Sequence, residues 1–217
     1  MARLLYLAKR VRPDLLVTVS FLTTRVQCST EEDLGKLDRC LRYLNSTSSL
    51  GIVLDCSKGL GVSAWIDASY AVHFDMRSHT GAIVSLGKGP IAVLSSKQKI
   101  NTKSSTEAEL VGLSDATSAV IWQRDFLIEQ GYCVDAAIVY QDNLSTIALA
   151  ERGAAASQRS KHIATRYFWV KDRISVGEIK LEYLPTSQML ADVLTKPLQG
   201  ELFRKLRDEL LNWYVVI

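Results

Sequence analysis

The sequence predicts an α/β protein in which a mixed central sheet is flanked by helices and preceded by a small helical segment. Apolar residues recur at helical spacing through residues 1–45, and after the polar stretch 45–49 the pattern changes to short apolar runs bounded by glycine. In this second part strands come first and helices then alternate with strands. That order is typical of a mixed sheet with helices packed against it.

The helical segment shows three successive patterns. The first ends before Pro13, and the second covers residues 14–26. Ser29 and Glu32 then predict a capping box, in which each side chain satisfies a free backbone amide at the start of a helix. We expect this third helix to bury one stripe, formed by Leu34, Leu37, Leu41 and Leu44.

The second part is expected to contain the sheet. Its predicted strands are 52–54, 62–66, 81–86, 91–94, 137–140 and 179–184. Its predicted helices are 105–130, 143–151, 160–176, a helix that begins at Thr186 or Ser187 and runs to Leu194, and 199–213. The small residues 153–158 predict a loop.

The length and composition of the chain exclude a membrane-spanning protein, a secreted protein and a zinc site. At 217 residues the chain is long enough for one domain with an attached piece, and no apolar run approaches the roughly 20 residues of a membrane span. The N-terminal apolar segment is too short for a secretory signal. Four scattered cysteines and three histidines lack zinc-ligand spacing, so idle thiols in an intracellular protein are expected.

The net charge of +3 is mild, but the cations are clustered. Residues 87–103 hold four lysines and no acid, and residues 152–173 hold six cations against Asp172 alone. Such clusters suit a phosphate backbone. Each cluster taken singly is explained at least as well by a solvated protein face.

Glu109 is the acid with the most informative position. In the predicted helix 105–130 it shares a face with Leu113, Ala116 and Val120, so it heads an apolar stripe that must face the core. Glu107 lies on a more polar row. A carboxylate at the rim of a core needs a partner, and a bound cation is one solution. The alternative is an acid that the helix dipole favours in the first turns.

Three aspartates are candidates to join Glu109. Asp142 follows a predicted apolar strand, at an edge where α/β sheets hold ligands, but it would also serve as a helix cap. Asp67 follows Trp65 and Ile66 in another strand, with a turn-forming aspartate as the alternative. Asp192 lies among apolar residues near the C-terminus, with an exposed helix residue as the alternative. If the four acids meet, their oxygens suit magnesium, which is a hard cation.

A series of short motifs gives these acids a context. In chain order they are Trp65–Ala68, Ser78–Gly81, Ser95–Lys99, Ser104–Glu109, Gln141–Asn143, Arg159–Ile163 and Ala191–Leu198. Together they resemble the ribonuclease H domain of Copia-type LTR-retrotransposon Pol polyproteins over about residues 61–198. Residues 1–48 resemble the helical C-terminal tail of the preceding reverse transcriptase, residues 49–198 the ribonuclease H-like domain, and residues 199–217 form a C-terminal helix.

The resemblance implies a magnesium-dependent endonuclease that hydrolyses the RNA strand of RNA–DNA hybrids. It implies that Asp67, Glu109, Asp142 and Asp192 are catalytic and hold two magnesium ions, with manganese as a substitute. The implied partners are the hybrid and the reverse transcriptase of the same polyprotein, in the cytoplasm or nucleus and without a membrane. Expected substrate contacts are Ser104, Ser105, Thr106, Lys97, Lys99, Asn143, Lys161 and His162.

One departure from cellular ribonucleases H concerns the segment before Asp192. Those enzymes carry a mobile histidine there, whereas this chain has Pro185–Gln188. His162 lies elsewhere in the order, and a phosphate contact or a structural role is expected for it. Two other functions stay open: a catalytically idle nucleic-acid-binding or structural remnant, and a different nuclease on the same fold.

Overall fold

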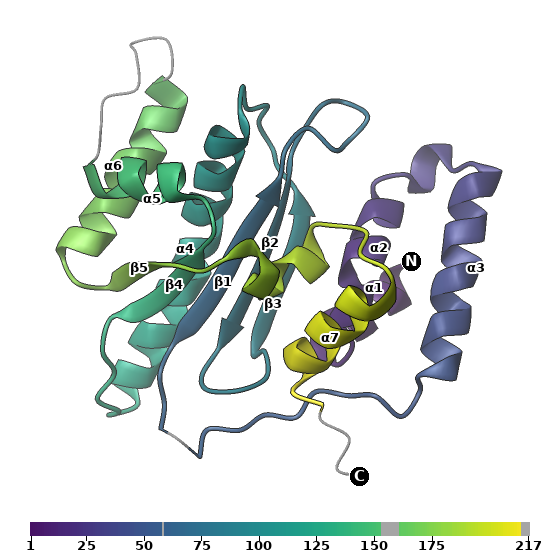
Figure 1. Cartoon of the computed structure of the whole chain (residues 1–217), viewed down its shortest axis with the longest axis horizontal. Helices are drawn as coiled ribbons and strands as arrows, with labels where there is room; N and C mark the ends of the chain where they lie inside the picture. Colours follow the sequence, from purple (N-terminus) through teal and green to yellow (C-terminus); the bar gives the residue numbers. More distant parts are fainter. Residues whose placement is uncertain (58, 153–160, 214–217) are drawn as a thin grey trace.

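A five-stranded sheet forms the centre of the molecule (Figure 1). The computed structural model describes residues 1–57, 59–152 and 161–213, the side chains of residues 161–164 excepted. The strands are β1 (Ser63–Ser69), β2 (His79–Ser85), β3 (Ala92–Lys97), β4 (Ala137–Gln141) and β5 (Ile179–Tyr183). Their order is β3-β2-β1-β4-β5: β1, β2 and β3 are antiparallel neighbours, whereas β4 runs parallel to β1 and to β5. The predicted class, a mixed sheet flanked by helices, is confirmed.

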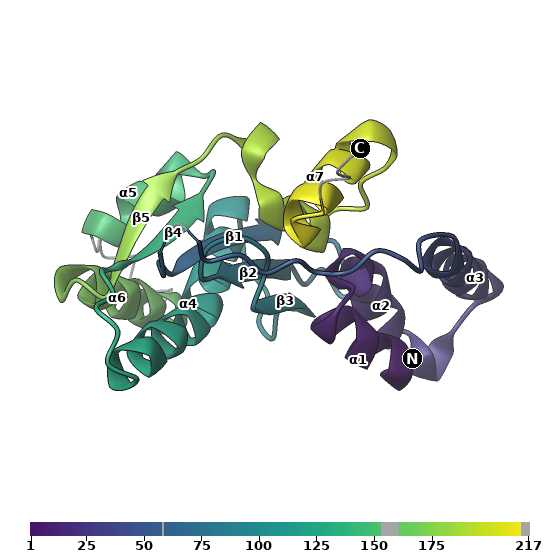
Figure 2. The same ribbon diagram turned by 90° about the horizontal axis from the view of Figure 1, so that it is seen from below.

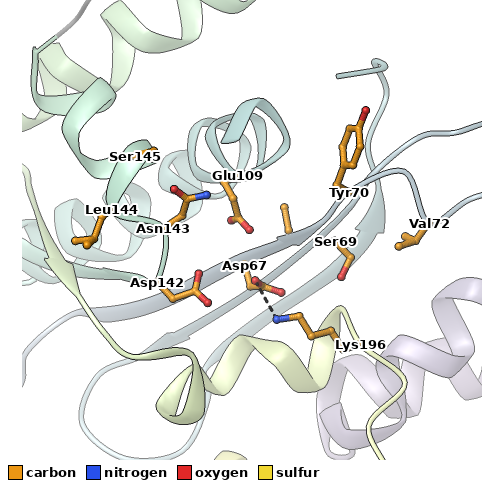
Figure 3. A pocket seen from close by; sticks show the side chains of 11 residues that line it. Asp67, Ser69, Tyr70, Val72, Glu109, Asp142, Asn143, Leu144, Ser145 and Lys196 are labelled. Carbon is orange, nitrogen blue, oxygen red and sulfur yellow. Dashed lines mark ion pairs between the residues drawn. The ribbon is translucent and has the colours of Figure 1, made fainter. Parts of the chain in front are cut away.

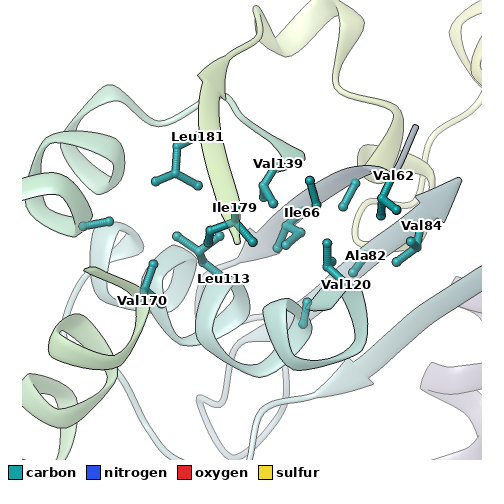
Figure 4. Close-up of a cluster of buried hydrophobic side chains, with 14 of the residues drawn as sticks. Val62, Ile66, Ala82, Val84, Leu113, Val120, Val139, Val170, Ile179 and Leu181 are labelled. Atoms are coloured by element: carbon teal, nitrogen blue, oxygen red, sulfur yellow. The ribbon is translucent and has the colours of Figure 1, made fainter. Parts of the chain in front are cut away.

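Helices cover both faces of this sheet. The long helix α4 (Ser105–Glu129) and α6 (Lys161–Ser175) lie on one side, with α5 (Leu144–Arg152) beside them, and α7 (Gly200–Leu211) lies on the other (Figure 2). In Figure 4, Leu113 and Val120 of α4 point toward Ile66 and Val139 of the sheet, and all four side chains are buried. The helical periodicity therefore predicted correctly which face of α4 is buried.

The N-terminal helices pack beside the sheet and share a second core with the C-terminal part of the chain. They are α1 (Ala2–Arg10), the short 3-10 helix η1 (Pro13–Leu15), α2 (Leu16–Thr23), a second 3-10 turn η2 (Val26–Cys28) and α3 (Glu31–Ser46). Leu16 and Val19 of α2 join Met189, Leu194 and Leu206 in this core. The N-terminal segment thus supports the region around residues 189–194, whereas the predicted division into three parts stays a prediction. No helix in the described ranges is both long and apolar enough to cross a bilayer.

The predicted capping box of α3 is wrong by one residue. Thr30, not Ser29, is the N-cap: its hydroxyl accepts from the Asp33 amide at 3.3 Å, and Asp33 Oδ2 accepts from the Thr30 amide at 3.1 Å. Arg25 donates to the same Asp33 oxygen at 3.1 Å. Asp33, whose side chain is shorter than that of glutamate, therefore accepts the bond from the N-cap amide that was expected of Glu32, and Arg25 holds it in place.

The prediction that α3 buries its leucine stripe is also wrong. Leu34 is 65% exposed and Leu41 45%, while Leu37 and Leu44 are half-buried. The buried positions of α3 are instead Asp33 and Cys40, because one narrow side of α3 packs against the molecule, where it contacts α2 and where Tyr43 reaches Asp14 of η1 and Phe203 of α7.

Two other predicted elements take a different form. Residues 52–54 make no strand, since the Val53 amide donates to the Leu211 carbonyl at the end of α7 and the Val53 carbonyl accepts from Asn212. Residues 186–194 form two 3-10 helices, η4 (Thr186–Gln188) and η5 (Leu190–Leu194), separated by the extended Met189 at ψ 96°. All five residues of η5 are buried, so it is a tight connector rather than an amphipathic helix. The predicted loop 153–158 lies outside the described residues.

Candidate metal centre at the carboxyl ends of β1 and β4

Asp67 lies near the carboxyl end of the central strand β1 and is 1% exposed. Its neighbours Ile66 and Ala68 point to the α4 side of the sheet, so the alternation of a strand turns Asp67 toward η5. There its Oδ2 accepts a hydrogen bond from the Thr195 hydroxyl. This contact fixes one carboxylate oxygen and leaves the other, Oδ1, for a further partner.

Glu109 reaches the same place from the second turn of α4 and is 6% exposed. The Gln141 side chain donates to its carboxylate, at 3.3 Å from Nε2 to Glu109 Oε2. Asp142 follows β4, which is parallel to β1, so the two strands deliver their aspartates to one edge of the sheet. The Thr186 hydroxyl donates to Asp142 Oδ2 at 2.7 Å.

These three acids converge. One carboxylate oxygen from each of Asp67, Glu109 and Asp142 lies within 4.8 Å of the others (Figure 3). They line a cavity of about 590 Å³ together with Lys196 and several polar residues, which include Ser69, Tyr70, Asn143 and Ser145. Because all three donors are oxygens, the set fits a hard divalent cation such as magnesium.

Asp192 approaches this group but is not one of the three. It lies on η5, and its Oδ1 is 2.6 Å from Lys196 Nζ. The same ammonium is 3.7 Å from Asp67 Oδ1, as the dashed line in Figure 3 shows. Lys196 thus stands between two of the four predicted acids. The sequence reasoning missed it, although its position four residues after Asp192 is the spacing of a helical ion pair.

Burial and the negative charges of neighbouring carboxylates change the pKa values of these acids. Burial first, and then the charges of Asp67 and Asp142, raise the pKa of Glu109 to about 9. Burial and the charge of Asp67 raise the pKa of Asp192 to about 6. Burial also raises the pKa of Asp67, while Lys196 acts in the opposite direction. A site that holds carboxylates in excess of its cations gains the most from binding a divalent cation.

Gln141 organises the centre, although the sequence predicted no role for it beyond its place in the motif Gln141–Asn143. It is fully buried at the end of β4, and its Oε1 accepts from the backbone amides of Asp142, at 2.8 Å, and Asn143, at 3.1 Å. Its Nε2 donates to Glu109. One side chain therefore connects α4 to the turn after β4. An amide at the last position of an apolar strand was the available signal.

The predicted substrate contacts are placed unevenly around the cavity. Asn143 lines it, and its Oδ1 also accepts from the Thr146 amide at the start of α5. Ser104 caps α4, Ser105 is exposed and Thr106 half-buried. Lys99 is exposed, whereas Lys97 pairs with Asp75 and lines a second cavity beside α2. Lys161 and His162 lie in α6, and their side chains are outside the described part of the chain.

The chain is similar to proteins encoded by transposons. It is 35% identical over 201 residues to the retrovirus-related Pol polyprotein from transposon RE1 of Arabidopsis thaliana, which covers 92% of this chain and 14% of that protein. The Pol polyprotein from transposon RE2 of the same plant is 36% identical over 195 residues, or 89% of this chain and 13% of that protein. The chain therefore spans about a seventh of the relatives that it matches. No family model matches it.

Among solved structures, the fold is similar to LC11-RNase H1, which was isolated from compost by a metagenomic approach. The TM-score is 0.47 at 14% identity, and the match covers 62% of this chain and 91% of the other.

Proposed function

Since this chain belongs to the Pol polyproteins of Copia-type transposons, we propose that it is their ribonuclease H portion. In this proposal it hydrolyses the RNA strand of RNA–DNA hybrids with magnesium. The observation that carries the proposal is the convergence of the Asp67, Glu109 and Asp142 oxygens within 4.8 Å at the carboxyl ends of two parallel strands. A magnesium-dependent nuclease needs such a cluster of oxygen ligands.

The three acids would hold the cation, and their neighbours would orient them. Magnesium, when bound, supplies positive charge to the phosphate and lowers the pKa of water. Thr195 fixes Asp67, Gln141 fixes Glu109, and Thr186 fixes Asp142, each through a hydrogen bond to the carboxylate. Such outer partners set the direction of the ligand oxygens and their basicity. Asp192 would be the fourth carboxylate ligand, on the side of the centre where Lys196 lies.

The substrate would lie over the open side of the cavity. Ser69, Tyr70, Asn143 and Ser145 line it and offer hydroxyl and amide groups beside the acids. Proteins recognise the RNA strand of a double helix mostly by shape and by contacts to 2′-hydroxyls in the wide minor groove. These neutral donors and acceptors suit that recognition.

We also propose that residues 1–48 are the end of the reverse transcriptase in the same polyprotein, and that residues 49–198 are the nuclease domain. The shared core of α2, η5 and α7 supports a lasting contact between the two parts. In this arrangement the polymerase tail would stabilise the segment that carries Asp192.

Cleavage of a labelled RNA–DNA hybrid tests the proposed activity. We expect the full chain to cut the RNA strand with magnesium and not with EDTA. Asp67→Asn should reduce the rate by roughly 10²–10³-fold, the loss typical of one missing electrostatic stabiliser. The matched control is Asp135→Asn, since Asp135 is exposed and precedes β4 at the opposite edge of the sheet.

Substrate preference separates the alternatives. Equal cleavage of duplex DNA would indicate a different nuclease on the same fold. A chain that binds the hybrid without cutting it, in magnesium and in manganese, would be the idle binding remnant.

A further inference from the structure

We propose that Lys196 takes the place of a second divalent cation between Asp67 and Asp192, so that its ammonium and a cation bound there exclude each other. The inference rests on the proposed function, because it assumes that the acids bind divalent cations. It goes beyond that function by assigning a competing internal cation to one half of the centre.

The contacts of the ammonium define this position. Lys196 Nζ lies 2.6 Å from Asp192 Oδ1 and 3.7 Å from Asp67 Oδ1, and both carboxylates are almost fully buried. The other oxygen of Asp67 is held by Thr195. Asp67 Oδ1 is therefore the oxygen that would contact a cation on the Asp192 side, and the ammonium already occupies the space between these carboxylates.

The charges explain why an internal cation is needed there. Two neighbouring buried carboxylates without a partner would be strongly unfavourable, and the lysine compensates them in the absence of metal. The position shared by Asp67, Glu109 and Asp142 is different, since Lys196 forms an ion pair with Asp67 but not with Glu109 or Asp142. A first cation can therefore bind to the convergent oxygens, whereas a second must displace the lysine.

Lys196 has a route out of the site. Its side chain is 35% exposed, while those of Asp67 and Asp192 are 2% and 8% exposed. The flexible four-carbon stem allows the head group to turn toward solvent without a change in the backbone. We therefore expect two unequal binding events, a tighter one at the three convergent acids and a weaker one at Asp192.

Calorimetric titration of the full chain with Mg²⁺ and with Mn²⁺, without nucleic acid, tests the competition. Lys196→Met keeps the stem and removes the charge, and should tighten the second binding event at least tenfold while it changes the first much less. The control is Lys180→Met, which removes a lysine from the exposed Lys180–Glu182 pair on β5 and should leave both events unchanged.

A measurement on the unaltered chain guards against a variant that fails to fold. The ¹⁵N side-chain signal of Lys196 should move and lose protection from exchange as the second cation binds. If the first event occurs but the lysine signal stays fixed, or Lys196→Met leaves the second affinity unchanged, the competition is refuted and the proposed nuclease stands. If neither cation binds to any variant, both proposals fail.

Discussion

Gly81 lies directly opposite Asp67 in the antiparallel register of β1 and β2, and it opens the space through which Thr195 reaches that aspartate. A Cβ at position 81 would lie 2.6 Å from Thr195 Cγ2 and 2.9 Å from Leu194 Cβ. The absence of a side chain on β2 therefore brings the segment that contains Asp192, Thr195 and Lys196 against the sheet.

Gly81→Ala should displace this segment. We expect a loss of about 1–3 kcal/mol in the free energy of unfolding, typical of overpacking a filled core, and weaker binding of Mg²⁺. Urea unfolding and calorimetry measure the two effects. Gly35→Ala is the control, since nothing lies within 4 Å of a Cβ at that helical position and the change should stabilise α3. Equal effects of the two substitutions would refute the steric argument.

Gln141→Met should separate orientation of the acids from their charge. The variant keeps the volume and removes both hydrogen-bonding groups, so the buried Glu109 carboxylate and the amides of Asp142 and Asn143 lose a partner. We expect a loss of about 1–3 kcal/mol in stability. Affinity for Mg²⁺ should fall by roughly 10–100-fold, as for other lost outer partners of metal ligands.

The control for that variant is Gln130→Met, at the exposed end of α4. It should leave both quantities unchanged. Normal Mg²⁺ affinity in Gln141→Met would show that Gln141 supports the fold only.

The parts of the site that could be predicted are those that depend on local periodicity. The choice of Glu109 over Glu107 needs only the helical repeat, and the structure buries Glu109. The position of Asp142 needs only the rule that ligands lie at the carboxyl ends of parallel strands. The first feature is set within one helix, and the second follows from the order of strands and helices along the chain, so both can be predicted from the sequence.

The parts that escaped prediction depend on how distant segments meet. Lys196 reaches Asp67 only because Gly81 lets η5 approach β2, and nothing near Lys196 in the sequence indicates this approach. The bonds of Val53 to Leu211 and Asn212 likewise come from the other end of the chain, which is why an apolar run that resembles a strand is not one.

The buried histidine pair makes the fold sensitive to acid. His79 is fully buried, and its Nε2 lies 2.7 Å from the Ser95 hydroxyl, which itself donates to the Leu194 carbonyl. His79 Nε2 must therefore carry a proton, and Nδ1 accepts from His73 at 3.0 Å. Burial, and then the charge of His73, lower the pKa of His79 to about 3.

Protonation of His79 should therefore oppose folding. An unfolded histidine titrates near pH 6.5. Between about pH 6.5 and 3 the unfolded chain binds a proton that the folded chain does not, so stability is present above this range and falls as the pH is lowered. One such group contributes a slope of up to about 1.4 kcal/mol per pH unit. The raised pKa of Asp192, about 6, contributes in the opposite direction over part of this range, so the test is a comparison of two chains. In urea unfolding from pH 7 to pH 4, His79→Gln should lose stability less steeply than the unaltered chain. An unchanged slope in the variant would assign the acid sensitivity to other groups.

The exposed leucines of α3 should affect association rather than folding. Leu34 is 65% exposed and Leu41 45%, so replacing both by Gln removes little buried area and should change stability by less than about 0.5 kcal/mol each. Leu16→Ala, in the core that α2 shares with η5, should instead destabilise by about 2–5 kcal/mol.

Exposed apolar side chains on one helix favour self-association. Light scattering of the Leu34→Gln, Leu41→Gln double variant should therefore show less self-association than the unaltered chain at the same concentration. A large loss of stability in this double variant would mean that α3 packs against the rest of the molecule more tightly than its exposed leucines indicate.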